Sequence, residues 1–176
     1  IGPMDQRALQ VIRLTAHQRD APLLSFGAEF DISREREGFF SLLKSGAQPV
    51  VYNDLLVRMI GPHQQENAAV AAILAHSIRD RLPYSEQALR NGLISARHPG
   101  RMEWLATNIL VDCAHNEAGA RRLAEYLQSL KSPLPITFVL GFSREKNIRT
   151  IALSFMPLAG RILTTHCQHP RALSSK

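Results

Sequence analysis

The second half of the chain alternates short apolar runs with amphipathic segments, and this alternation restricts the possible folds more than any other feature. Apolar and β-branched residues at 108–111, 136–140 and 161–164 have the length of buried strands. Segments 118–130 and 147–156 place apolar residues at helical spacing. Strands that alternate with helices in this way predict an α/β fold, in which a parallel sheet is connected by crossover helices.

The first half has a different pattern, in which helical segments flank a polar, glycine-containing stretch. Pro62 suits the first turn of a helix, and the alanine-rich residues after it favour helix strongly. Ser85 is a candidate N-cap for the next helix. The predicted elements are helices at 5–19, 62–82 and 85–96, a short strand at 23–27, a β-rich excursion at 31–48, and a strand pair at 48–60 around Asn53-Asp54.

The tripeptide His98-Pro99-Gly100 separates these two patterns, because proline and glycine interrupt regular structure. A chain of 176 residues is long enough for one ordinary domain or two small ones. We therefore expect two α/β pieces, residues 1–98 and residues 104–176, joined by a linker at 99–103.

Composition and charge exclude several classes of protein. Hydrophobic residues make up 45% of the chain and charged residues 20%, which is typical of a globular protein. The net charge is +6, but the arginines are scattered and no aromatic residues interleave with them, so anionic small molecules are better partners than nucleic acid. There is neither a long apolar run for a membrane span nor a secretory signal, and only two cysteines are present. A cytoplasmic monomer without membrane contact is expected.

The segment Asp112-Cys113-Ala114-His115-Asn116 follows a predicted strand and precedes a predicted helix. In open parallel sheets, ligands bind beyond the carboxyl ends of the strands, and the start of a helix favours anions. Asp112 and His115 are therefore candidates for chemistry, because Asp can hold a ribose hydroxyl or a cation and His can move a proton. The alternative is that Asp112 and Asn116 are ordinary turn and cap residues.

Two further segments offer polar groups of a similar kind. Asn67 follows Gly61-Pro62-His63-Gln64-Gln65 at the start of the alanine-rich helix, and its amide can both donate to and accept from an adenine edge. Arg101, in Pro99-Gly100-Arg101-Met102-Glu103, has a planar guanidinium that can hold phosphate with two hydrogen bonds. Taken singly, Asn67 is a helix-start residue and Arg101 a surface arginine.

In this order the three segments resemble the Mur ligase superfamily, and most closely its folylpolyglutamate synthase/dihydrofolate synthase branch. Asp112 to Asn116 is similar to the D-x-A-H-N motif of the superfamily, Gly61 to Ala68 to the G-x-H-Q-x-x-N-A pattern, and Pro99 to Glu103 to P-G-R-[LM]-E. Weaker similarity continues through Leu140 to Ile148 and Pro170 to Ala172. The set of three motifs is specific, whereas each motif alone is weak.

The resemblance implies a fold and a function. Residues 1–98 would be the C-terminal part of the central ATP-binding domain, and residues 104–176 an incomplete Rossmann-like ligase domain. Asn67, Arg101 and Asp112 match positions that contact ATP, and His115 matches a histidine close to the nucleotide and the acyl-transfer site. The resemblance thus implies His115 and Asp112 as catalytic residues. The implied reaction uses ATP and Mg²⁺ to phosphorylate the carboxylate of folate or dihydropteroate, after which the amine of L-glutamate attacks the acyl phosphate.

The sequence departs from the family pattern at several positions. Cys113 replaces a residue that is usually glycine or another small residue, and Glu117 replaces a common proline. No G-x-x-x-x-G-K-[ST] phosphate loop is present, and we assign no metal ligand to this chain because the family places the Mg²⁺ ligands upstream. The 176 residues alone are therefore expected to be inactive. Two other hypotheses stay open, a cell-wall Mur ligase and a non-catalytic nucleotide-binding remnant.

Overall fold

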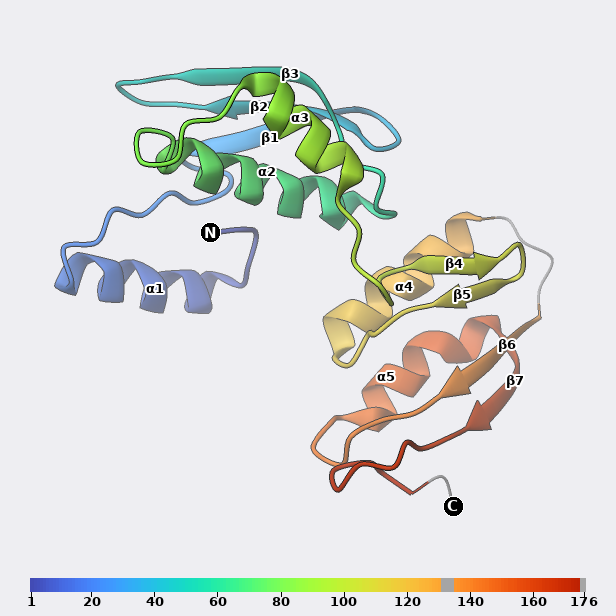
Figure 1. Cartoon of the computed structure of the whole chain (residues 1–176). Helices are drawn as coiled ribbons and strands as arrows, with labels where there is room; N and C mark the ends of the chain where they lie inside the picture. The colour runs from blue at the N-terminus through green and yellow to red at the C-terminus, as the bar shows by residue number, and fades with distance from the viewer. Residues whose placement is uncertain (131–134, 175–176) are drawn as a thin grey trace. The chain divides into compact units, whose positions relative to one another are not determined.

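The computed structural model describes residues 1–130 and 135–174, and it divides into two compact units, Ile1–His98 and Pro99–Lys176 (Figure 1). Each unit has a separate hydrophobic core. The mixture of helices and strands confirms the predicted α/β class. Residues 175 and 176, which the predicted C-terminal domain includes, lie outside the described residues.

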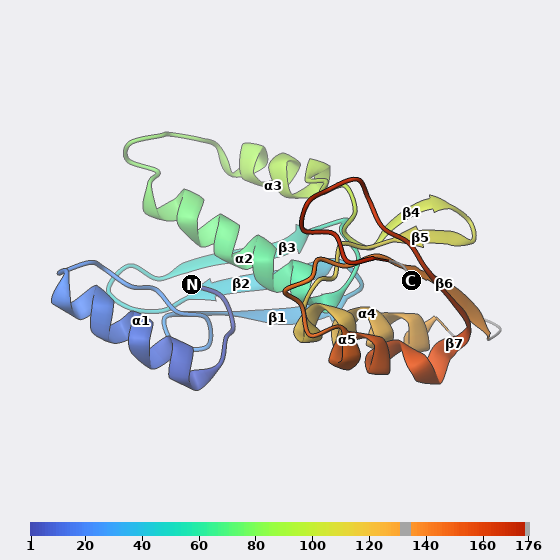
Figure 2. The same ribbon diagram turned by 90° about the horizontal axis from the view of Figure 1, so that it is seen from below.

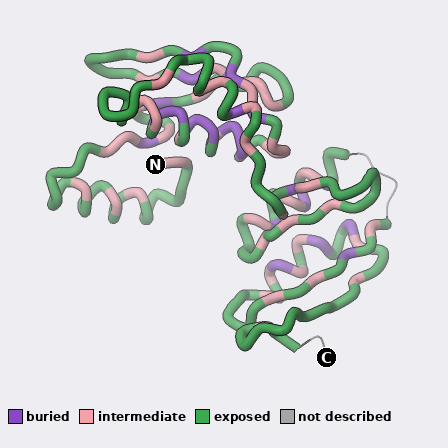
Figure 3. Tube along the Cα trace, viewed as in Figure 1, coloured by how far each residue is buried: buried purple, intermediate pink, exposed green. Residues whose placement is uncertain are grey.

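The first unit is built on an antiparallel sheet of three consecutive strands, β1 (Phe30–Arg36), β2 (Phe39–Lys44) and β3 (Val50–Leu56). Helix α2 (Pro62–Ser77) packs against β1 and β2, and α3 (Glu86–Ser95) packs against β3 (Figure 1 and Figure 2). Buried positions line the faces where these elements meet (Figure 3). The core residues are Phe30, Phe40, Leu42, Tyr52, Leu55, Val57, Ala68, Ala69, Ala72, Ile73 and Leu93.

Helix α2 approaches the sheet closely because its buried face is made of small side chains. Ala69 and Ala72 are completely buried, and Ala68 is nearly so. The helix begins at Pro62, as predicted, but it ends at Ser77 and not at Leu82. Past the helix end, the backbone N–H groups of Arg79 and Arg81 bond to carbonyls three residues earlier, so residues 78–82 form turns and do not continue α2.

Two other predicted helices are confirmed with small changes in their bounds. Helix α1 (Gln6–Gln18) starts after Asp5, whose side chain accepts a hydrogen bond from the N–H of Arg7 at 2.9 Å. None of its residues is buried (Figure 3). Helix α3 starts after Ser85, which caps the N–H of Ala88 at 3.1 Å as predicted.

The strand predictions for the first unit are partly wrong. Residues 23–27 form no strand, because Gly27 adopts a φ of 79° and the chain turns into β1 through a single bridge between Phe26 and Phe30. Residues 48–60 contribute one strand, β3, and not a pair. Asn53 and Asp54 form a bulge within β3, where the register shifts and Asp54 has a φ of 53°.

The second unit contains two short sheets and two helices among its described residues (Figure 1). A hairpin of β4 (Glu103–Ala106) and β5 (Ile109–Val111) leads into α4 (Glu117–Ser129). Strands β6 (Ile136–Leu140) and β7 (Ala159–Thr164) are parallel and are connected through α5 (Ile148–Phe155) and a 3-10 turn at Met156–Leu158. The core residues are Ala120, Ala124, Leu127, Phe138, Ile151, Phe155 and Leu158.

The pairing of β5 corrects the predicted parallel sheet. Sequence reasoning placed 108–111, 136–140 and 161–164 in one parallel sheet, but β5 pairs with β4 in an antiparallel ladder, and the parallel pairing described in this unit is that of β6 with β7. The cause is the additional strand at Glu103–Ala106, which was not predicted and lies close enough in sequence to form a hairpin. The Rossmann-like identity of residues 104–176 stays a prediction.

Candidate functional site

The turn at Pro99–Glu103 is held in shape by hydrogen bonds from within the turn and from the end of β5. The backbone N–H of Gly100 donates to Oε2 of Glu103 at 2.7 Å, and the carbonyl of Gly100 accepts from the N–H of Cys113 at 2.7 Å. Gly100 has a φ of 72°, a conformation that a residue without Cβ adopts readily. Arg101 is exposed at the outside of this turn.

Asp112 ties this turn to the end of β5. Its Oδ2 accepts a hydrogen bond from the backbone N–H of Met102 at 2.8 Å, and its Oδ1 accepts from the N–H of Ala114 at 2.7 Å. Met102 is buried and has a φ of 45°, so its N–H reaches Asp112 only in an uncommon backbone conformation. Each carboxylate oxygen therefore positions one of the two backbone segments that carry Arg101 and His115.

His115 is exposed, and its ring is oriented by the preceding turn. Nδ1 lies 3.0 Å from the carbonyl oxygen of Cys113. Since a carbonyl oxygen only accepts, this contact requires the proton on Nδ1 and leaves Nε2 as the acceptor of the neutral ring. Asn116 then caps α4, accepting from the N–H of Gly119 at 2.8 Å. The turn and cap roles considered for Asp112 and Asn116 are thus both present.

Asn67 lies in the first unit, on the exposed side of the first turns of α2. Its Nδ2 donates to Oε1 of Gln64 at 3.1 Å, and Nε2 of Gln64 lies 3.1 Å from Nε2 of His63. Gln64 is only 2% exposed, so a buried side chain orients the amide of Asn67. Gly61, with a φ of 105°, allows the sharp entry into the helix.

A second buried glutamine fixes the start of α2 to the sheet. Nε2 of Gln65 donates to the carbonyl of Phe39 at 2.8 Å, and Glu66 forms an ion pair with Arg34 of β1 at 2.5 Å. Sequence reasoning did not single out Gln64 or Gln65. The residue type gave no signal of this burial, because glutamine is mostly exposed in folded proteins.

The structure therefore brings Arg101, Asp112 and His115 together in the second unit and places Asn67 in the first. Asp112 positions Arg101 and His115 indirectly, because it accepts hydrogen bonds from the backbone N–H groups of neighbouring residues. The described residues contain no group of three His, Cys, Asp or Glu side chains that could hold a metal ion. Among the described residues, no helix is long and apolar enough to span a membrane.

The known proteins that this chain resembles include folate ligases that match nearly its whole length. A family model described as dihydrofolate synthetase, C-terminal domain, matches residues 101–171. The dihydrofolate synthase/folylpolyglutamate synthase of Bacillus subtilis (strain 168) is 30% identical over 179 residues, which cover 96% of this chain and 40% of that protein. The chain thus spans about two fifths of the length of the curated relatives it matches first.

Solved structures of folylpolyglutamate synthases are also similar to this chain. The Mycobacterium tuberculosis folylpolyglutamate synthase complexed with ADP is similar with a TM-score of 0.83 and 28% identity, covering 99% of this chain and 39% of that one. A bifunctional folylpolyglutamate synthase/dihydrofolate synthase with Mn, AMPPNP and L-glutamate bound has a TM-score of 0.76 and 25% identity, covering 94% and 38%.

More distant similarity reaches the cell-wall ligases. A UDP-N-acetylmuramoyl-L-alanyl-D-glutamate–L-lysine ligase of Streptococcus pneumoniae is 29% identical over 125 residues, which cover 69% of this chain and 24% of that protein. The folate enzymes match more of the chain at similar identity. The chain therefore belongs to the folylpolyglutamate synthase/dihydrofolate synthase family of the Mur ligase superfamily and matches its C-terminal portion.

Proposed function

We propose that this chain is part of an ATP-dependent ligase that joins L-glutamate to a folate, either by extending tetrahydrofolate or by converting dihydropteroate to dihydrofolate. The observation that carries the proposal is the double use of Asp112, which holds the Arg101 turn and the His115 turn at the end of one strand. Support also comes from the similarity to the B. subtilis enzyme, which covers 96% of the chain.

Arg101 is the proposed phosphate ligand. Its side chain is exposed, and its backbone is fixed on both sides by the contacts of Gly100 and Met102. A guanidinium with a fixed origin can bind phosphate oxygens through two hydrogen bonds without losing much additional freedom. Asp112 is the positioning residue for Arg101, and Asn67 is a proposed ATP contact of the first unit.

The proposed reaction has two steps. A carboxylate oxygen of the folate takes the terminal phosphoryl group of ATP, and ADP leaves. The glutamate amine then attacks the acyl carbon, the amide bond forms, and inorganic phosphate leaves with the bonding electrons. The amine must lose a proton, and Nε2 of His115 is a proton acceptor at an exposed position. Mg²⁺ is expected to neutralise the phosphates, but no group of three possible ligands occurs among the described residues, so no step is assigned to a metal held by this chain.

The domain assignments belong to the same proposal. Residues 1–98 would be the C-terminal part of the central ATP-binding domain, 99–103 the linker, and 104–176 the Rossmann-like ligase domain. The compact units meet at His98 and Pro99, which is consistent with this division.

A substrate panel tests the proposal. The chain in its natural sequence context would be assayed for ATP-dependent ligation of glutamate to dihydropteroate and to tetrahydrofolate, and for ligation of amino acids to a UDP-N-acetylmuramoyl peptide. Turnover of either folate substrate, with release of ADP and phosphate, is expected. Turnover of the cell-wall substrate alone would instead support a Mur ligase, and binding of ATP without any turnover would support a nucleotide-binding remnant.

A further inference from the structure

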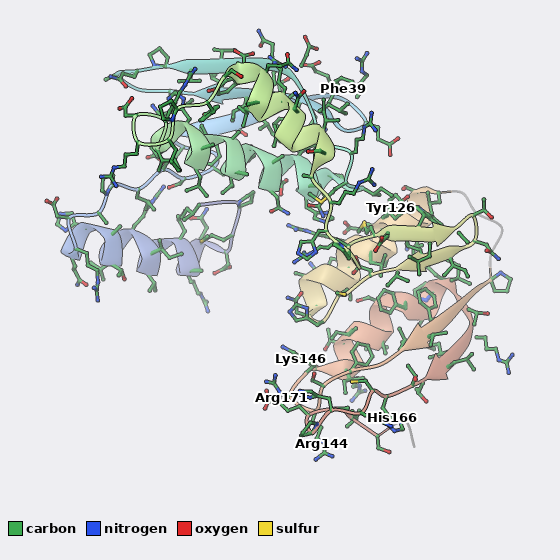
Figure 4. The ribbon with its side chains drawn as sticks, viewed as in Figure 1. Phe39, Tyr126, Arg144, Lys146, His166 and Arg171 are labelled. Carbon is green, nitrogen blue, oxygen red and sulfur yellow. The ribbon has the colours of Figure 1, made fainter. Side chains whose placement is uncertain are left out.

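Two buried glutamines stand next to each other at the start of α2 and have different partners. Gln64 is 2% exposed and Gln65 is 5% exposed. Burial of an amide is unfavourable unless hydrogen bonds replace those it made with water. Gln65 donates to the carbonyl of Phe39, the first residue of β2, and so joins the helix to the sheet (Figure 4). Gln64 instead uses its amide for two side chains of α2 itself.

The amide of Gln64 connects His63 to Asn67. Its Nε2 lies 3.1 Å from Nε2 of His63, and its Oε1 accepts a hydrogen bond from Nδ2 of Asn67 at 3.1 Å. An amide nitrogen only donates and an amide oxygen only accepts. The contact with His63 therefore requires an unprotonated Nε2 on that ring, and it leaves Oε1 of Gln64 directed at Asn67.

The orientation of the Gln64 amide determines that of the Asn67 amide. The two residues are three positions apart on α2, so their side chains share one face of the helix. If the Asn67 amide turned over, its Oδ1 would face Oε1 of Gln64, and two acceptors would meet without a proton between them. The buried Gln64 would then have an unpaired oxygen, which is unfavourable. The observed orientation of Asn67 is therefore held in place.

This orientation leaves an acceptor available to a ligand. Asn67 is exposed, and its Oδ1 accepts no hydrogen bond from the described residues. Adenine carries an N6 amino group, which donates, whereas guanine carries O6, which only accepts. Hypoxanthine also carries an oxygen at this position. A freely turning amide could pair with either kind of purine, but an amide that presents only its oxygen pairs with the amino group.

We infer that Gln64 sets the base specificity of the nucleotide site, because it holds the Asn67 amide in the orientation that accepts from the N6 amino group of adenine. The inference rests on the proposed function, in which Asn67 is an ATP contact. Gln64 is a positioning residue, since it is buried and acts through Asn67. The selected ligands are nucleotides of 6-aminopurines, and nucleotides of 6-oxopurines are rejected.

ATP and ITP are the probes that test this selection. Their bases differ only in the amino group or oxygen at C6 and in the proton that the oxo form carries on N1. ITP also lacks the 2-amino group of GTP, so its rejection cannot arise from a clash with that group. Dissociation constants would be measured by calorimetry on the complete ligase with Mg²⁺ and without folate. The unaltered protein should bind ATP at least about tenfold more tightly than ITP.

Gln64→Met removes the polar contacts of Gln64 at similar volume. The Asn67 amide can then turn over and donate to the oxygen of hypoxanthine. ITP should therefore bind more tightly than it does to the unaltered protein, and the preference for ATP should fall to about threefold or less. A merely structural defect would weaken the binding of both nucleotides and would not improve the binding of ITP.

Gln65→Met is the matched control, because it removes the adjacent buried glutamine of the same helix. Gln65 bonds to the carbonyl of Phe39, so this variant should lower stability but retain the ratio of ATP to ITP affinity. Gln64→Glu provides a second test that does not depend on the folding of Gln64→Met. A carboxyl group keeps an acceptor oxygen for Asn67, and the preference for ATP should persist.

An unchanged affinity ratio in folded Gln64→Met, loss of the preference in Gln64→Glu, an equal change in Gln65→Met, or equal binding of ATP and ITP to the unaltered protein would each overturn the inference. Failure of the proposed function has a different signature. A protein that shows the expected ATP preference but ligates no glutamate in the substrate panel would contradict the function, whereas ligation without that preference would contradict only the role of Gln64.

Discussion

Oδ2 of Asp112 accepts a hydrogen bond from the backbone N–H of Met102 at 2.8 Å, so a side chain at the end of β5 fixes a turn ten positions earlier in the sequence. The other oxygen of the carboxylate holds the N–H of Ala114. Each of these two hydrogen bonds requires that the Asp112 oxygen it uses is an acceptor. Asp112 therefore fixes the backbone of the turn that carries Arg101 and of the turn that carries His115.

Asp112→Asn should destabilise the chain. The amide keeps one acceptor oxygen but turns an NH₂ group toward the second backbone N–H, which then lacks a partner at a cost of about 1–3 kcal/mol. Urea unfolding of the variant would measure the loss. Glu125→Gln, which removes an exposed carboxylate from α4 in the same unit, should change the unfolding free energy by less than about 0.5 kcal/mol. Equal stability of the two variants would contradict the positioning role.

Arg101→Ala should leave the fold intact and reduce activity in the complete ligase. The side chain is exposed, and the turn is held by backbone groups and by other side chains. Loss of a phosphate-binding guanidinium should lower kcat/KM by about 100-fold or more. Circular dichroism would check folding, and Arg122→Ala is a control from the same unit. Unaltered turnover by the Arg101 variant would remove it from the site.

The first unit should lose stability in mild acid because of His76. Burial lowers the pKa of His76 below its ordinary value of 6.5, and the nearby charge of Lys44 adds to this effect. Nδ1 of His76 also lies 3.3 Å from the hydroxyl of Tyr52. The unfolded chain takes up the proton more readily than the folded chain. The stability contributed by neutral His76 is therefore complete above about pH 6.5 and is lost as pH falls through the lower pKa of the folded state.

Unfolding free energies between pH 7.5 and pH 5 would measure this dependence. His76→Gln should reduce the decline of stability with falling pH, even if it lowers stability at neutral pH. His17→Gln, at an exposed position of α1, should retain the decline. An identical pH profile for the His76 variant and the unaltered chain would contradict the assignment.

Replacing two glycines by alanine should have opposite effects. Gly61, before α2, has a φ of 105°, which strains any residue with a Cβ, so Gly61→Ala should cost about 1–2 kcal/mol. Gly92 lies within α3, where an added Cβ would meet no neighbouring heavy atom within 4 Å, so Gly92→Ala should stabilise the chain by about 0.5–1 kcal/mol. Thermal unfolding would compare them, and a stabilising Gly61 variant would contradict the geometry.

Helices were predictable from the sequence because their causes are local. Ser85 caps α3, and the alanines of α2 form its buried face. The hairpin at Glu103–Ala106 was not predictable in the same way, because four residues carry too little periodicity and the pairing depends on the partner strand. The bulge at Asn53 and Asp54 has a similar origin, since two turn-favouring residues were accommodated inside a strand that its neighbour stabilises.

The sequence motifs nominated Asp112, His115, Arg101 and Asn67 as candidate site residues, and their roles stay a prediction. The contacts that these residues make were not predictable. That Asp112 reaches Met102 depends on a φ of 45° at a buried methionine, a conformation that residue preferences disfavour and that only the surrounding structure imposes. Buried polar anchors such as Gln64 were missed for a related reason, because their burial arises from the sheet that α2 contacts.

The close approach of Gly100 to Cys113 leaves no room for a side chain at position 100. A Cβ at position 100 would lie 2.6 Å from Sγ of Cys113. The φ of 72° at Gly100 disfavours a Cβ independently of that neighbour. A smaller side chain at 113 would remove the first obstacle and leave the second, so sequence change at position 100 is restricted for two separate reasons.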